Sequence, residues 1–260
     1  MIIDAHAHVF PDAIAEKASH GIEAFYDITV QNNGTLGRLL EMETEAGVQK
    51  AIIQSPATTP HQVTSINDFI HECTQEYPDR VIGFMTMHPD FEDIEGEVKR
   101  CMDMGLKGLK IHPDFQRFNI DSPEAYRIYE AIEGKLPILV HTGDFRYQWS
   151  KPARLAKVMD DFPNLTVIGA HFGGWSEWDD ALEAFRGKKI YVDTSSTMYD
   201  MPPEKVKELI NSYGIEYVMF GSDYPMWNSK DELEMFDKLD LTASERELIL
   251  HGNAERMLNL

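Results

Sequence analysis

The chain has 260 residues, and 43% of them are hydrophobic, which is enough apolar material for a substantial core. Lys and Arg number 24 against 44 Asp and Glu, and the formal charge of −20 repels phosphate backbones, so we exclude nucleic acid as an expected partner. The two cysteines, Cys73 and Cys101, form no disulfide framework, which predicts a reducing, cytoplasmic setting. We expect no signal peptide, because an apolar strand begins near Met1, and no membrane span, because no apolar run is long enough.

The first predicted strand, 2–8, carries two histidines on one face. Asp4, His6 and His8 alternate with Ala5 and Ala7, and such alternation is typical of a β-strand. Residues two apart on a strand face the same way, roughly 6.5–7 Å apart, so the two imidazoles can converge on one ion. The alternative is a structural pair of buried histidines whose nitrogens are satisfied by other protein groups.

Seven further strands follow, each of them short and mostly apolar and each succeeded by an amphipathic stretch. We expect these strands at 49–54, 81–87, 108–111, 137–141, 166–171, 190–193 and 217–222. The helical patterns lie at 36–46, 64–76, 91–104, 123–133, 152–161, 175–185, 203–212 and 230–239, and 242–260 reads as closing helices.

Strand and helix alternating eight times predict parallel strands with crossover helices. In about 250 residues this is the size of a (β/α)8 TIM barrel, which we expect as a single domain over 1–260. A doubly wound open sheet is the alternative, but no G-x-G-x-x-G and no Walker-type loop supports it. Two connections, 11–34 and 144–151, are longer than plain turns and follow strand carboxyl ends, so we expect lids or pocket walls there.

Six of the ten histidines end predicted strands or follow them directly: His6, His8, His88, His112, His141 and His171. The eighth strand ends with a carboxylate, Asp223. Every strand of a barrel opens its carboxyl end onto the same face, so these side chains should collect there. Nitrogen and oxygen ligands suit Zn²⁺, with Mn²⁺ or Fe²⁺ as alternatives, and a bound ion lowers the pKa of its water toward about 7.

Five motifs in order, DAHAH, GLKIHP, VHTG, GAHFGG and GSDYP, together resemble the amidohydrolase superfamily. The resemblance is strongest to the branch with aminocarboxymuconate-semialdehyde decarboxylase, related aromatic-acid decarboxylases and several lactone hydrolases. It implies that one divalent ion is held by His6, His8, His141 and Asp223. It also implies that His171 contacts substrate or moves a proton, and that Asp223 orients or deprotonates the metal-bound water. The alternative for His171 is a hydrogen-bonding partner behind the metal ligands.

Lys110, on the fourth strand, has three possible roles. In binuclear members of the superfamily a lysine there is carboxylated and bridges two metals. The other roles are a cation that binds a substrate carboxylate, which we favour, and a structural ion pair. We expect His112 to be a packing residue at the rim, and Asp4 and Asp193 to form hydrogen bonds around the site.

Aromatic residues crowd the predicted loops: Phe145, Tyr147, Trp149, Trp175, Trp178, Tyr224 and Trp227. They suggest a flat organic substrate, bound by Trp175 with Arg146 and Lys110 supplying positive charge for its carboxylate. The alternative is cover for the barrel rim or a subunit contact, which makes a homodimer possible.

The leading expectation is a metal-dependent hydrolase that acts on a lactone, amide or ester through a metal-activated water. The alternative is a metal-dependent, non-oxidative decarboxylase of an aromatic or unsaturated carboxylic acid. Both use the same residues and a small organic acid or lactone as substrate. A third possibility is a barrel that holds a metal without catalysis.

Overall fold

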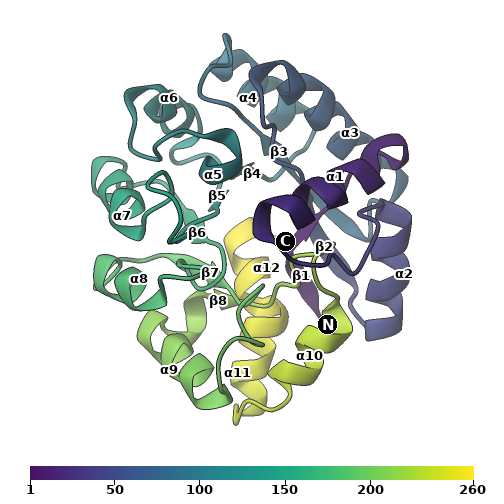
Figure 1. Ribbon diagram of the computed structural model, residues 1–260, viewed down its shortest axis with the longest axis vertical. Coiled ribbons are helices and arrows are strands. Elements are labelled where there is room, and N and C mark those ends of the chain that lie inside the picture. The colour runs from purple at the N-terminus through teal and green to yellow at the C-terminus, as the bar shows by residue number, and fades with distance from the viewer.

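A computed structural model describes residues 1–260 and contains eight parallel strands, adjacent in the order of the sequence. They are β1 (Ile3–His8), β2 (Lys50–Gln54), β3 (Val81–Thr86), β4 (Gly108–Ile111), β5 (Ile138–Val140), β6 (Val167–Gly169), β7 (Tyr191–Asp193) and β8 (Val218–Met219). The chain after β8 returns to β1: the Ala5 amide donates to the Phe220 carbonyl at 2.8 Å, and Ala7 pairs with Tyr224. The sheet therefore closes, and the predicted (β/α)8 barrel is confirmed, with helices surrounding the strands (Figure 1).

The helices that follow the strands lie close to their predicted positions, and two, α2 and α7, have the predicted bounds. The Thr35 side chain caps α2 by accepting from the Arg38 amide at 3.3 Å. The helices outside the first connection are α2 (Leu36–Ala46), α3 (Val63–Glu76), α4 (Ile94–Asp103), α5 (Pro113–Gln116), α6 (Pro123–Ile132), α7 (Pro152–Asp161), α8 (Trp178–Ala184), α9 (Pro203–Tyr213), α10 (Ser229–Phe236), α11 (Ala243–Glu247) and α12 (Asn253–Leu258).

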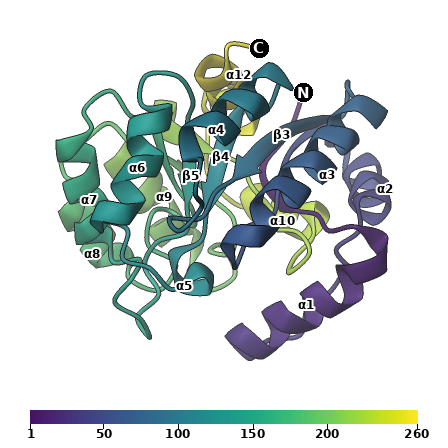
Figure 2. The same cartoon turned by 90° about the horizontal axis from the view of Figure 1, so that it is seen from above.

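The first connection, 11–34, contains a helix that the sequence analysis missed. Helix α1 (Asp12–Tyr26) buries only the narrow stripe Ala15, Ser19 and Ile22. A serine within the buried stripe and Gly21 within the helix weaken the amphipathic signal, which explains the omission. Figure 2 shows α1 apart from the other helices, beyond the ends of the strands.

The core has three parts, one of which is a cluster of 11 buried residues that joins Val192 of β7 and Val218 of β8 to Leu209 of α9. A cluster of 38 buried residues, among them Leu109 and Ile138, packs strands against the surrounding helices. Another cluster of 11 joins strand residues such as Ile52 and Ile168 to Leu258 of the closing helix α12. None of the helices combines the length and the apolar content that crossing a bilayer requires.

Candidate metal centre and substrate cavity

Three predicted metal ligands meet at the carboxyl ends of β1 and β8. The Nε2 atoms of His6 and His8 are 3.1 Å apart, and each lies 3.4 Å from Oδ1 of Asp223. All three side chains are buried, and their ligand atoms lie within 4.8 Å of one another. The period-two alternation of β1 places the two imidazoles side by side, and the end of β8 brings the carboxylate to them.

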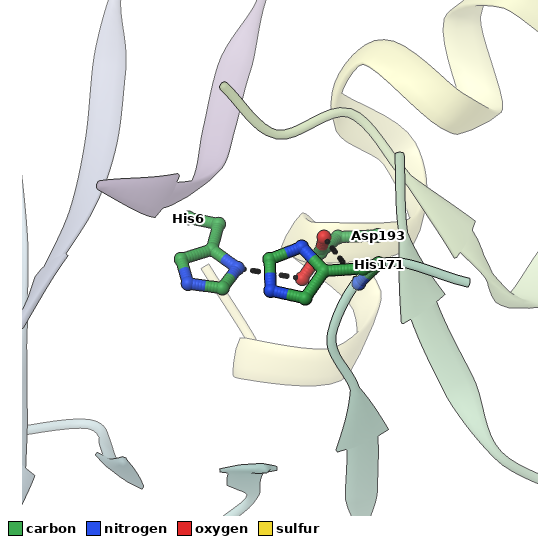
Figure 3. Close-up of side chains that lie close together, drawn as sticks. All are labelled: His6, His171 and Asp193. Atoms are coloured by element: carbon green, nitrogen blue, oxygen red, sulfur yellow. Dashed lines mark hydrogen bonds and ion pairs between the residues drawn. The ribbon is translucent and has the colours of Figure 1, made fainter. Parts of the chain in front are cut away.

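Asp193, at the end of β7, orients this group. Its Oδ2 lies 3.0 Å from Nδ1 of His6, and its Oδ1 accepts from the His171 amide at 3.1 Å (Figure 3). With the Nδ1 proton of His6 donated to Asp193, the lone pair of Nε2 faces His8 and Asp223. A carboxylate behind a histidine is the usual support of a metal-bound imidazole.

The chemistry of this donor set fits a divalent ion. Burial and the nearby Lys110 charge hold the pKa of His6 well below its usual range, and burial also lowers the pKa of His8, so both imidazoles stay neutral. Oδ1 of Asp223 is buried without a hydrogen-bond partner, a costly state for a carboxylate oxygen. Two neutral nitrogens and one such oxygen, directed at one another, are ligands that Zn²⁺ and Mn²⁺ accept.

The fourth predicted ligand, His141, is not part of this group. Its Nδ1 lies 3.1 Å from Nε2 of His171, and its ligand atoms group instead with those of His112 and Asp114. The structure thus brings three of the four predicted ligands together and places His141 beside His171, one side chain away from Asp223.

A second buried group, made of His112, Asp114 and His141, lies next to the first. The rings of His112 and His141 stack with centroids 3.9 Å apart. Oδ2 of Asp114 lies 3.7 Å from Nε2 of His141, and neither Asp114 oxygen has a hydrogen-bond partner. Burial raises the pKa of Asp114 to about 7. His112, buried as expected, accepts the Phe115 amide at 3.3 Å and so caps α5.

His171 follows β6 and faces both groups. Its Nδ1 lies 3.0 Å from the Ser195 carbonyl, which places a proton on Nδ1 and directs the Nε2 lone pair toward His141. His171 and Asp223 have left-handed backbone conformations, with φ of 58° and 60°. Non-glycine residues adopt this conformation at a cost and concentrate at functional sites, which agrees with the position of both residues at the barrel mouth.

The two predicted substrate-binding cations both contact other protein groups, Lys110 in the buried interior and Arg146 at the surface. Lys110 is fully buried, with Nζ 3.2 Å from Nε2 of His6, and burial lowers its pKa to about 8. The Arg146 guanidinium is paired with Asp144 at 2.7 Å and donates to the Phe25 carbonyl at 2.7 Å. Neither cation lines the two cavities at the site, so their contact with substrate stays a prediction that this geometry does not support.

Two cavities, of about 560 and 170 Å³, reach His141, His171 and Asp223. Trp175, which we predicted to bind substrate, lines the smaller one. Tyr26, from α1, lines both, and its hydroxyl lies 2.9 Å from Nε2 of His112. Tyr26 was not among the predicted site residues, because the sequence pattern did not predict α1 and the segment around Tyr26 carries no motif.

Comparison with known proteins gives a family match over nearly the whole chain: a family model described as amidohydrolase matches residues 3–260. The decarboxylase orsB of Emericella nidulans is 27% identical over 127 residues, which are 40% of this chain and only 38% of the relative. The 2-amino-3-carboxymuconate-6-semialdehyde decarboxylase of Caenorhabditis elegans is 23% identical and is aligned over 99% of this chain and 94% of its own.

Solved structures share the fold. The 5-carboxyvanillate decarboxylase of Novosphingobium aromaticivorans, complexed with manganese and 4-hydroxy-3-methoxy-5-nitrobenzoic acid, has a TM-score of 0.79 at 20% identity, covering 100% of this chain and 96% of that one. A probable 2-pyrone-4,6-dicarboxylic acid hydrolase of Acinetobacter baumannii has a TM-score of 0.73 at 16% identity, covering 100% and 99%. At these identities the likeness supports the barrel alone.

Proposed function

This chain belongs to the amidohydrolase family, and from that membership we propose that it catalyses the metal-dependent, non-oxidative decarboxylation of a small aromatic or unsaturated carboxylic acid. The observation that carries the proposal is the group of His6, His8 and Asp223 beside His171 at a cavity. The expected preference for hydrolysis is not confirmed. The names of the sequence relatives favour the decarboxylase alternative, whereas the hydrolase of similar fold keeps hydrolysis as the second candidate.

We assign His6, His8 and Asp223 as ligands of one divalent ion and keep His141 as the candidate fourth ligand. Zn²⁺ remains the first expectation, and Mn²⁺ gains support from the manganese in the structure of the similar decarboxylase. When bound, such an ion supplies Lewis acidity that stabilises negative charge on a substrate oxygen.

The chain's own residues would move the proton. Loss of CO2 breaks a carbon–carbon bond and leaves its electron pair on the substrate carbon, which then needs a proton. A protonated His171, which lines both cavities, would donate from Nε2, now 3.1 Å from Nδ1 of His141, while its Nδ1–H stays held by the Ser195 carbonyl. Asp193, which holds the backbone amide of His171, keeps this ring in place beside the ligands.

Aromatic walls would orient a flat ring. Tyr26 and Trp175 lie with ring centroids 5.0 Å apart, and Phe115 lines the larger cavity.

The two cysteines are free and buried, which supports the expected reducing compartment.

The test is product analysis on metal-loaded protein with carboxylated phenols, unsaturated acids and lactones. We expect one CO2 released per substrate consumed. Ring opening without CO2 would favour hydrolysis instead, and a protein that binds metal but converts no compound would be the non-catalytic barrel.

A matched pair of variants localises the chemistry. His171→Asn should retain metal and lose roughly 100-fold or more in kcat, the range of general acid catalysis. His251→Asn, which alters a histidine paired with Glu255 on the closing helices, is the control and should retain full activity. Equal activity in the two variants would reject the role of His171.

A further inference from the structure

The larger cavity extends well beyond the metal centre. From His171 and Asp223 it reaches α1 and the first half of α3, which form its outer walls. On α1 the lining residues Ile14, Ala18 and Gly21 recur at helical spacing, and Ile66 and Phe69 of α3 line the same cavity. We call this outer part, bounded by these five residues, the apolar arm.

A second anionic group in the larger cavity would meet one cation, the exposed Lys17, and the polar side chains of Thr58, Gln62 and Ser65 at its outer end. No arginine lines either cavity, and the one lysine that does, Lys17, is exposed on α1. Arg146, the nearest cation to the aromatic walls, is already paired with Asp144. Burying a carboxylate without a partner is costly, whereas burying hydrocarbon there is favourable.

We propose that the substrate is a carboxylated ring that carries an apolar substituent of several carbons, and that this substituent lies in the apolar arm between α1 and α3. This inference rests on the proposed function. Cavities of roughly 300–1,000 Å³ hold drug-sized ligands, and about 560 Å³ is more room than one carboxylated ring needs. The arm is continuous with the site, because His8 and His141 line the same cavity.

Burial of the substituent in the apolar arm should change KM and not kcat. Each buried methylene contributes about 0.8 kcal/mol, which corresponds to about fourfold in binding. The substituent lies away from the reacting carboxylate, so it stabilises bound substrate and transition state equally. Such uniform binding lowers KM and leaves kcat unchanged.

Gly21 provides a way to fill the arm. A Cβ built at Gly21 meets no atom within 4 Å, and its backbone is helical, so the Cβ of Gly21→Phe is accommodated without a clash. The change also removes a glycine from a helix interior, where glycine is less favourable than most other residues. Gly37, on α2, is the matched control, because its Cβ likewise meets nothing and it lines neither cavity.

The experiment compares three probes on the metal-loaded enzyme: 2,6-dihydroxybenzoate, its 4-pentyl derivative and its 4-carboxy derivative. We expect KM for the pentyl compound to be lower than for the parent by roughly tenfold or more, with similar kcat, and no gain for the dicarboxylate. In Gly21→Phe the ratio of parent to pentyl KM should fall to about one, while Gly37→Phe keeps the ratio of the unmodified enzyme.

Equal KM values for parent and pentyl probes in the unmodified enzyme would overturn the proposal, and so would a pentyl advantage that survives Gly21→Phe. If Gly21→Phe does not fold, Ile66→Asn places an amide on the opposite wall and must reduce the same ratio. If no probe is decarboxylated, the proposed function fails separately. Calorimetric binding of the parent and pentyl probes then decides, since tighter pentyl binding that Gly21→Phe abolishes supports the arm and equal binding refutes it.

Discussion

The barrel mouth contains three buried groups of two histidines and one aspartate, and two of them, His6 with His8 and Asp223 and His6 with His171 and Asp193, share His6. The instructive comparison is between the first group, His6, His8 and Asp223, and the second group, His112, Asp114 and His141, which have no residue in common. In both, the ligand atoms lie within 4.8 Å of one another. The groups differ in the hydrogen-bond partners of their imidazole nitrogens and carboxylate oxygens. In the first, Asp193 holds Nδ1 of His6, and Oδ1 of Asp223 is 3.4 Å from two imidazole nitrogens.

In the second group, the nitrogens of His112 are already engaged. Its Nδ1 accepts the Phe115 amide, and its Nε2 lies 2.9 Å from the Tyr26 hydroxyl. The nearest approach of Asp114 to an imidazole nitrogen is 3.7 Å. Composition and proximity are common to both groups and do not separate them as candidate metal centres. A supporting carboxylate that turns a lone pair inward distinguishes the first group from the second.

The largest expected effect is on metal content. Asp223→Asn removes the only carboxylate of the first group, and we expect metal affinity to fall by more than about 100-fold, because the effect should exceed that of losing a supporting residue. His112→Asn is the matched control in the second group, since Asn preserves the helix cap. Metal content by elemental analysis after dialysis checks both. Metal lost from His112→Asn and kept in Asp223→Asn would reverse the assignment.

The next effect concerns the support itself. Asp193→Asn keeps the size of the side chain but no longer enforces the tautomer that points Nε2 of His6 at the ion. We expect metal affinity to fall about 10–100-fold, measured by competition with a chelating dye. An unchanged affinity would show that Asp193 does not create the difference between the two groups.

The second group should instead limit stability. Asp114 has an ordinary pKa of 3.8 that burial raises to about 7. Between these values the unfolded chain releases the proton and the folded chain keeps it, so stability falls as the pH rises through this window and stays low above it. Asp114→Asn should remove this loss and stabilise metal-free protein by about 2 kcal/mol at pH 8, with little difference at pH 4.

Denaturant unfolding of chelator-treated protein at both pH values checks this prediction. A variant that is less stable at pH 8 would show that the Asp114 carboxylate has a partner. Metal binding reduced as much as in Asp223→Asn would instead make Asp114 a ligand.

The barrel and the first group follow from local patterns. Period-two alternation places His6 and His8 on one face, and closure of a parallel barrel brings Asp223 from the eighth strand to the first. Neither step requires knowledge of side-chain packing, which is why both were accessible from the sequence.

The remaining features depend on packing between distant segments. His141 ends the fifth strand as expected, yet its ring stacks on His112, which no strand pattern encodes. Arg146 pairs with Asp144, two residues earlier, a contact that no strand or helix pattern encodes. Tyr26 lies on a helix whose buried stripe is too narrow to recognise, so a residue that lines both cavities escaped notice.

The smallest expected effect comes from a hydroxyl that contacts the second group. Tyr26→Phe keeps the aromatic wall but removes the hydroxyl that lies 2.9 Å from His112 and 3.5 Å from His141. One such hydrogen bond contributes about 1 kcal/mol, so we expect kcat/KM to fall about fivefold, with metal content unchanged. Tyr77→Phe, at the end of α3, is the control, because Tyr77 lines neither cavity. If Tyr26→Phe also loses metal, the second group takes part in holding the ion. The two groups then differ only in how strongly they bind it. If kcat/KM does not change, the hydroxyl only fastens α1, and the stacked histidines do not influence the reaction through it.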